Sequence, residues 1–281
     1  MHTYLVTGST GNAGSEVVRA LVGTSENVRA LVRSEDRAAA VPAGAEPVVG
    51  DLNRPETLPL ERVTGVFLLS GYRDLPVALS EMRRAGVQRV VLLSSSAVPG
   101  GDMTNAVARY HIESEAAVRE SGLAWTMLQP NSFMTNTLQW VPQLEAGDVV
   151  RAPFAGVRVA TIDPADIAAV AARALVSAEH EGRSYRLSGP ESLLPADRLA
   201  VLARVLDRPL RFEAQSDDEA RAEMSAAMPA EYVDAFMRFF VDGTLDESEV
   251  LPTVESVLGR PPRSFEDWVR ANADRFRTAA G

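Results

Sequence analysis

A strand, a glycine-rich turn and a helix begin the chain, and this stretch limits the fold more than any other. The apolar run Tyr4–Val6 predicts a buried strand, and the residues after Gly14 have the apolar spacing of a helix. Between them stand three glycines at intervals of three: Gly8, Gly11 and Gly14. Such glycines permit a tight turn, a close phosphate and close helix packing. The context predicts nucleotide binding at the helix N-terminus; the alternative is an ordinary surface turn.

Composition excludes several kinds of chemistry. The chain has 281 residues, of which 46% are hydrophobic, so a large core is available. It has no Cys, and all 28 basic residues are Arg, so thiol chemistry, Schiff bases and a Tyr-Lys catalytic pair are excluded. The net charge of −10 argues against nucleic-acid binding, and no apolar stretch is long enough to span a membrane. We expect a cytoplasmic protein, monomeric or homodimeric, with no membrane or nucleic-acid partner.

The second predicted strand, Asn27–Val32, ends where dinucleotide folds contact the adenosine ribose. An acidic residue there would bond the ribose hydroxyl of NAD, whereas an arginine suits the 2′-phosphate of NADP. This position holds Arg33, with Arg37 one turn later. We therefore expect NADP; the alternative is a solvated arginine at a strand end.

Strands alternate with helices as far as Leu128, which predicts an α/β fold with a doubly wound parallel sheet, a Rossmann fold. A helix at 163–176 and a strand at 183–187 follow, and from Pro195 the chain is mainly helical. We expect an NAD(P)-binding core at 1–155, a helix and strand returning to it at 156–189, and a smaller, mainly helical substrate-side subdomain at 190–281. The acidic run 217–219 predicts a helix N-terminus rather than a metal site.

Polar side chains follow several predicted strands, at the sheet edge where ligands bind in open parallel sheets. Asp51 and Leu52 would lie near the adenine; alternatively, Asp51 caps the helix that begins at Pro55. The strand that ends before Ser70 should run under the cofactor. A later strand ends in the hydroxyls of 94–96, of which at least one serves as a simple cap and others contact nicotinamide or substrate.

A set of ordered motifs gives the chain a family resemblance. The motifs are the glycine turn, Ala30–Arg33, Gly50–Leu52, His111–Glu115, Ser121–Leu123, Tyr185–Pro190 and Ser264-Phe-x-x-Trp268. Together they resemble the NmrA-like branch of the atypical short-chain dehydrogenases/reductases (atypical SDR). Within it the chain is most similar to NAD(P)H:quinone oxidoreductase 2 and triphenylmethane reductase.

The resemblance implies an NADP-binding core, a smaller C-terminal domain and a cleft between them. It carries cofactor contacts over to ten matching positions: Gly8, Thr10, Gly11, Asn12, Gly14, Arg33, Asp51, Leu69, Ser70 and Ser94. The turn of Pro130, Asn131, Ser132 and Phe133 would face the nicotinamide and substrate.

The chain departs from typical short-chain dehydrogenases at their Tyr-x-x-x-Lys pair. The fourth residue after Tyr110 is Ser114, and the fourth residue after His111 is Glu115. The His-x-x-x-Glu form is common in the NmrA-like branch. Residues at i and i+4 share a helix face, so we expect Glu115 to orient His111 and raise its pKa. The alternative is a surface histidine with an ion-pair partner. The remaining histidines, His2 and His180, are expected to be exposed.

We expect an NADPH-dependent oxidoreductase that passes hydride to a quinone or another conjugated acceptor, with a hydrophobic or aromatic small molecule as substrate. His111, with Ser95 or Tyr110, would supply any proton. The Met-rich segment 224–240 would line the pocket or simply form core. One alternative is a redox-sensing NADP-binding protein without turnover. Another, an epimerase, dehydratase or carbonyl reductase, is disfavoured because these generally use Tyr-Lys.

Overall fold

The chain divides into two compact units. The structure, a computed structural model, describes residues 2–24 and 26–277. Unit one comprises Met1–Gly101, Ala108–Pro130 and Pro164–Leu187. Unit two comprises Asp102–Val107, Asn131–Asp163 and Ser188–Gly281.

Unit one is built on a seven-stranded, wholly parallel sheet in the order β3-β2-β1-β4-β5-β6-β8. The strands are β1 (Thr3–Val6), β2 (Asn27–Val32), β3 (Glu46–Val49), β4 (Val63–Leu69), β5 (Arg89–Leu93), β6 (Ala124–Pro130) and β8 (Arg183–Leu187). The order reverses direction at β1, as in a doubly wound sheet. This confirms the predicted Rossmann fold.

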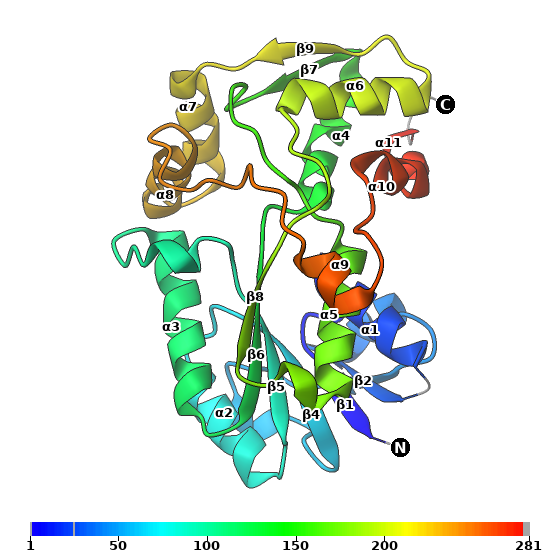
Figure 1. Cartoon of the computed structure of the whole chain (residues 1–281), viewed down its shortest axis with the longest axis vertical. Coiled ribbons are helices and arrows are strands. Elements are labelled where there is room, and N and C mark those ends of the chain that lie inside the picture. The colour runs from blue at the N-terminus through cyan, green and yellow to red at the C-terminus, as the bar shows by residue number, and fades with distance from the viewer. Residues whose placement is uncertain (1, 25, 278–281) are drawn as a thin grey trace. The chain divides into compact units, whose positions relative to one another are not determined.

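Helices cover both faces of this sheet (Figure 1). α1 (Asn12–Val22) packs against α5 (Pro164–Val176), which also contacts β4, β5 and β6. α2 (Leu75–Arg84) and Val118 of α3 (Ala106–Glu120) share a core cluster with Leu5, Leu68 and Leu92 of the strands. Because both faces are covered, the central strands are largely apolar; Tyr4, Leu5 and Val6 of β1 are at most 1% exposed. The edge strands β3 and β8 are more polar and more exposed.

Short 3₁₀ helices connect these elements. They are η1 (Glu35–Ala40), η2 (Pro55–Thr57), η3 (Val98–Gly100) and η5 (Ala178–His180).

Unit two is mainly helical and has its own core. Its elements are η4 (Met134–Trp140), α4 (Val141–Ala146), β7 (Val149–Ala152), α6 (Pro195–Leu206), β9 (Arg211–Ala214), α7 (Asp217–Ala227), α8 (Ala230–Phe240), α9 (Thr253–Leu258), α10 (Phe265–Ala271) and α11 (Ala273–Arg277). Trp140, Leu202 and Trp268 are at most 2% exposed and belong to one cluster. As expected for a helix N-terminus, Ser216 caps α7, and its hydroxyl accepts the N–H of Glu219.

The chain passes from unit one to unit two after Pro130, earlier than the expected boundary at residue 155. The segment 131–155 lies in unit two, because β7 pairs with β9 and not with the large sheet. The expected returning segment is divided between the units, since only Pro164–Leu187 belongs to unit one.

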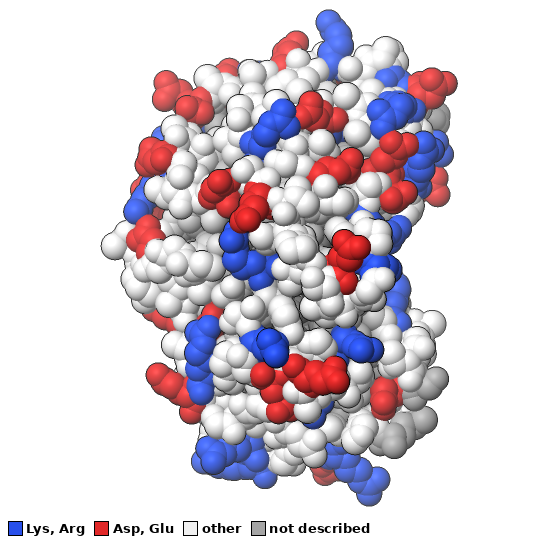
Figure 2. All heavy atoms as spheres, in the orientation of Figure 1, with Lys and Arg blue, Asp and Glu red and all other residues white. Residues whose placement is uncertain are grey.

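Charges are mixed over the surface in view. Figure 2 shows acidic residues and arginines interspersed on this face, so the excess negative charge does not form one broad patch there. Across residues 2–24 and 26–277, no helix combines the length and apolar character needed to cross a bilayer. Within the same ranges, no cluster of three or more His, Asp or Glu side chains could hold a metal ion.

Candidate functional site

The glycine turn has the conformation that a dinucleotide site needs. Gly8 has φ of +60°, and a Cβ there would lie 2.5 Å from Leu69 Cδ1. The N–H of Gly11 donates to the Gly8 carbonyl at 2.8 Å, which closes the turn. A Cβ at Gly14 would lie 2.2 Å from that same carbonyl oxygen. Two of the three glycines are thus required by contacts within unit one.

The start of α1 is open to an anion. Gly11 is the N-cap, no side chain caps the helix, and its first turn has no acidic residue. The first backbone N–H groups therefore have no partner within the helix, and the helix dipole is positive there. Thr10, Gly11 and Asn12 are exposed beside them. These features fit the pyrophosphate of a dinucleotide.

Two arginines stand where β2 ends. Arg33 follows β2 directly, and both Arg33 and Arg37 are exposed. Neither guanidinium makes an ion pair or hydrogen bond with another residue that the structure describes. The hydroxyl of Ser9 donates to the Leu31 carbonyl at 2.8 Å, which ties the glycine turn to the end of β2. The arginines are therefore available to a phosphate near this turn.

Asp51 organises its own turn. Its Oδ1 accepts the N–H of Asn53 at 2.9 Å, its Oδ2 lies 3.7 Å from Arg54 Nε, and its N–H donates to Thr57 Oγ1 at 3.0 Å. Arg54 is the N-cap of η2, so Asp51 is not the expected helix cap. Leu52 is 2% exposed and its side chain belongs to the core. A cofactor contact from Leu52 would therefore use its backbone.

Residues after β4 contact α3. Ser70 Oγ donates to the Leu93 carbonyl at 2.8 Å, and Leu69 N–H donates to Thr7 Oγ1 at 3.2 Å. Gly71 has φ of +90°, and a Cβ there would lie 3.3 Å from the Tyr110 ring. The carboxyl end of β4 and Tyr110 are thus neighbours, as a shared site requires.

Glu115 is held by partners that the sequence did not indicate. Its side chain is fully buried, and Oε1 accepts hydrogen bonds from Ser94 Oγ at 2.6 Å and Gln129 Nε2 at 2.8 Å. Oε2 pairs with Arg119 at 2.6 Å. The carboxylate therefore ties α3 to the carboxyl ends of β5 and β6. It also occupies the Ser94 hydroxyl, which we expected to contact the cofactor.

His111 behaves differently from our expectation. Burial lowers its pKa to about 4, whereas we expected Glu115 to raise it. Its Nδ1 is buried and has no hydrogen-bond partner among the described residues. The imidazole packs against the Tyr110 ring, with ring centres 4.2 Å apart and the planes tilted by 35°. His111 is thus neutral at neutral pH.

The remaining predicted residues fall on both units. In unit one, Ser95 Oγ accepts the N–H of Ala97 at 3.2 Å, which leaves its proton free to donate, and Pro130 ends β6. Asn131 and Phe133 follow in unit two. Asn131 Nδ2 donates to the carbonyls of Ala160 at 3.3 Å and Glu247 at 3.0 Å.

Phe133 forms a β-bridge with Ile162. Backbone and amide contacts thus hold this turn within unit two.

The expectation that His180 is exposed was wrong. The residue is 8% exposed, and its Nδ1 lies 2.8 Å from the Tyr185 hydroxyl.

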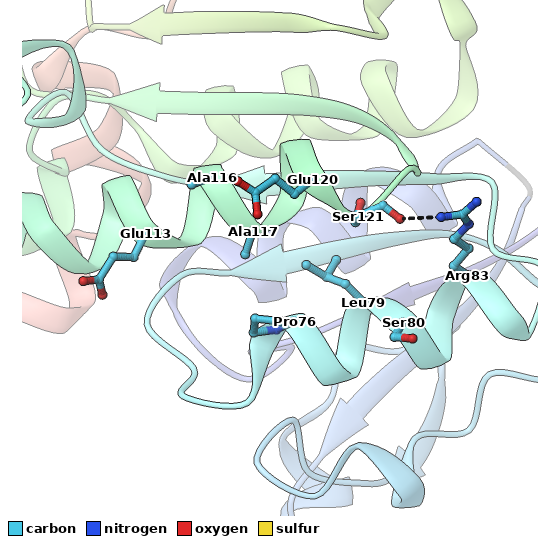
Figure 3. A pocket seen from close by; sticks show the side chains of 9 residues that line it. All are labelled: Pro76, Leu79, Ser80, Arg83, Glu113, Ala116, Ala117, Glu120 and Ser121. Carbon is cyan, nitrogen blue, oxygen red and sulfur yellow. Dashed lines mark hydrogen bonds between the residues drawn. The ribbon is translucent and has the colours of Figure 1, made fainter.

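A groove of about 510 Å³ lies elsewhere on unit one, between α2 and α3 (Figure 3). Its lining residues are Pro76, Leu79, Ser80, Arg83, Glu113, Ala116, Ala117, Glu120 and Ser121. Arg83 Nη1 donates to the Ser121 carbonyl at 3.4 Å at one end. None of the residues predicted for cofactor or reaction lines this groove.

Comparison with known proteins agrees with the geometry. A model of the NAD(P)H-binding family matches residues 8–178. A (4-alkanoyl-5-oxo-2,5-dihydrofuran-3-yl)methyl phosphate reductase from Streptomyces griseus is 39% identical, covering 97% of this chain and 98% of that protein. An NAD(P)H azoreductase from Xenophilus azovorans is 35% identical, covering 98% and 99%.

A solved structure has the same fold. The NADPH-dependent quinone oxidoreductase of Escherichia coli, complexed with NADPH, superimposes with a TM-score of 0.78 at 23% identity, covering 96% of this chain and 99% of that one. The glycine turn, the open start of α1 and these matches agree. The chain belongs to the NAD(P)H-binding family and is an NAD(P)H-dependent oxidoreductase.

Proposed function

We propose that this protein is an NADPH-dependent reductase that delivers hydride to a small molecule with a conjugated electrophilic double bond, such as a quinone. The observation that carries the proposal is the neutral, partly buried His111 beside Tyr110, in a chain without lysine. When bound, the reduced nicotinamide supplies the hydride. The residues of the chain bind, orient and protonate.

The cofactor contacts divide between its charged and its neutral parts. Backbone N–H groups at the start of α1, with Thr10 and Asn12, would bind the pyrophosphate. Arg33, assisted by Arg37, would bind the 2′-phosphate, which favours NADPH over NADH. Ser70 and the residues that end β5 and β6 would support the nicotinamide end.

The acceptor class follows from the weak acids available. A neutral imidazole and a phenol are weak acids. The carboxylate of Glu115 is held by hydrogen bonds from three partners, so it is not a free proton donor. A reductase with such donors suits acceptors whose charge after hydride addition is delocalised. The names of two relatives are consistent with this class: one specifies the methyl phosphate of an alkanoyl-substituted dihydrofuranone, the other an azoreductase.

A sensor without turnover was the alternative. The same cofactor site would serve it, but the two relatives described above are named as reductases, and this chain matches each of them over nearly its whole length. We therefore favour turnover.

The test is NADPH oxidation by the purified protein with quinones, azo dyes and conjugated furanones, with NADH in parallel. NADPH deuterated at the transferred position of nicotinamide C4 would show whether hydride passes directly, because deuterium then slows turnover and, with acceptors reduced at carbon, enters the product. We expect turnover with at least one acceptor class, faster with NADPH. Tight NADPH binding without turnover of any acceptor would contradict the proposal.

A further inference from the structure

One arginine of unit two lacks an anionic partner. Arg198 lies on α6, with its Cζ 5.5 Å from the centre of the Trp140 ring. No residue of the described part of the chain forms a hydrogen bond or ion pair with its guanidinium, and its Nε is fully buried. The residue as a whole is half-buried, and a cation partly withdrawn from water is costly unless something compensates it.

The surroundings of Arg198 do not neutralise it. Burial lowers its pKa to about 10, and the opposing attraction of Glu247 is smaller. The Glu247 carboxylate already accepts the N–H of Ser132 at 2.9 Å and its hydroxyl at 2.6 Å. Arg198 therefore remains charged at neutral pH, and its hydrogen-bond donors are unused.

Other donors beside it are unused as well. Trp140 Nε1 and Thr137 Oγ1 are buried and have no partner among the described residues. These residues are three apart in η4, and side chains at i and i+3 of a 3₁₀ helix eclipse one another. Thr137 and Trp140 thus occupy one side of the helix, and Arg198 stacks on Trp140. Unsatisfied buried donors in a native protein point to a missing acceptor.

We propose that Arg198, with Trp140 and Thr137, binds an oxyanion carried by the substrate: a phosphate, sulfonate or carboxylate group. The planar guanidinium fork matches such groups in a bidentate way. The inference rests on the proposed function and narrows its substrate class to anionic conjugated acceptors.

The test compares two quinones that differ in one anionic group, 1,2-naphthoquinone-4-sulfonate and 1,2-naphthoquinone. The ratio of their kcat/KM values is taken within each variant, so their unequal intrinsic reactivity cancels. Arg198→Met keeps an unbranched side chain as far as the position of Nε and removes the charged guanidinium fork. We expect the preference for the sulfonate to fall by about ten- to a hundred-fold in Arg198→Met, the worth of a charged hydrogen bond. Arg198→Lys should retain part of it.

The matched control is Arg204→Gln, which removes a positive charge from the exposed side of the same helix. It should leave the preference unchanged. An Arg198→Met ratio equal to that of the wild type would overturn the proposal, because a purely stacking role for Arg198 predicts this result. Thermal unfolding of each variant with NADPH establishes that it is folded.

If neither quinone is reduced, the proposed function fails for this acceptor class and the anion site is tested separately. Thermal unfolding is measured in inorganic phosphate and in chloride at equal ionic strength. Saturating NADP⁺ keeps the cofactor site filled. A higher midpoint in phosphate for the wild type, but not for Arg198→Met, supports the site. No phosphate effect on the wild type overturns it.

Discussion

At the residue scale, Arg33 is proposed to decide between the two nicotinamide cofactors. Arg33→Asp should raise the KM for NADPH by about ten- to a hundred-fold, because a charged hydrogen bond is lost and a like charge is introduced. The KM for NADH should change far less. Steady-state kinetics with both cofactors measure this. Arg84→Asp on the exposed surface of α2 makes the same charge change and should alter neither constant. Equal losses for both cofactors would contradict the assignment.

Gly14 makes a prediction about backbone packing. Gly14→Ala would place Cβ 2.2 Å from the Gly8 carbonyl oxygen, and backbone on both sides leaves little room to adjust. We expect weaker NADPH binding and a loss of stability of about 1–3 kcal/mol, typical of overpacking. Gly156→Ala, whose Cβ would meet open space, is the control. Titration calorimetry and urea unfolding measure the two effects; similar results for both variants would refute the packing argument.

His111 should make stability depend on pH. Its folded pKa of about 4 lies below the unfolded value of 6.5, so the unfolded chain binds more protons between them. The contribution of the neutral ring is full above the unfolded pKa and is lost as pH falls from about 6.5 towards 4. Urea unfolding across this window should show His111→Gln retaining about 1–3 kcal/mol more stability than the wild type at the acidic end, relative to pH 7. Parallel curves for the two proteins would exclude this role.

At the element scale, Glu115 fastens α3 to the sheet. Glu115→Gln should cost about 1–3 kcal/mol of unfolding free energy, because charged hydrogen bonds from Ser94, Gln129 and Arg119 are weakened. Glu113→Gln changes an exposed side chain on the same helix and should cost little. Chemical denaturation compares the unfolding free energies of the two variants. Equal losses would show that the buried contacts of Glu115 add no stability beyond that of an exposed glutamate.

The elements show which parts of the fold a sequence can predict. The central strands β1, β4 and β5 were predictable because both faces of the sheet are buried there and each strand is a largely apolar run. The pairing of β7 with β9 was not, because both strands have four residues, are partly exposed and lie far apart in the chain. The 3₁₀ helix η4 was not predicted either, because its residues show no hydrophobic periodicity that distinguishes it.

The same distinction applies to the candidate site. The glycine turn was predictable because its backbone requirement is local: Gly8 and Gly14 meet within one turn. The partners of Glu115 were not, because Ser94 and Gln129 end separate strands, and only the assembled sheet brings them to one carboxylate. Helical spacing alone suggested His111 instead.

At the scale of the whole molecule, unit one is completed late in the chain. β8 extends the sheet beyond β6, and α5 covers α1 and the central strands. A fragment ending at residue 163 lacks both and should show no NADPH-dependent rise in unfolding temperature. A fragment ending at residue 190 contains all of unit one and should show one. Protection of the shorter fragment would mean that α5 and β8 are dispensable.

The interleaving of the two units has a consequence for synthesis. During synthesis, the first six strands of the large sheet, β1 to β6, emerge from the ribosome first. The segment 131–163 of unit two emerges next, before α5 and β8 of unit one. That segment cannot form the core of unit two until the residues after 187 have been synthesised. Translation thus produces unit one first, around an unfinished loop, and a ribosome that pauses between residues 131 and 163 would expose the apolar face that α5 later covers.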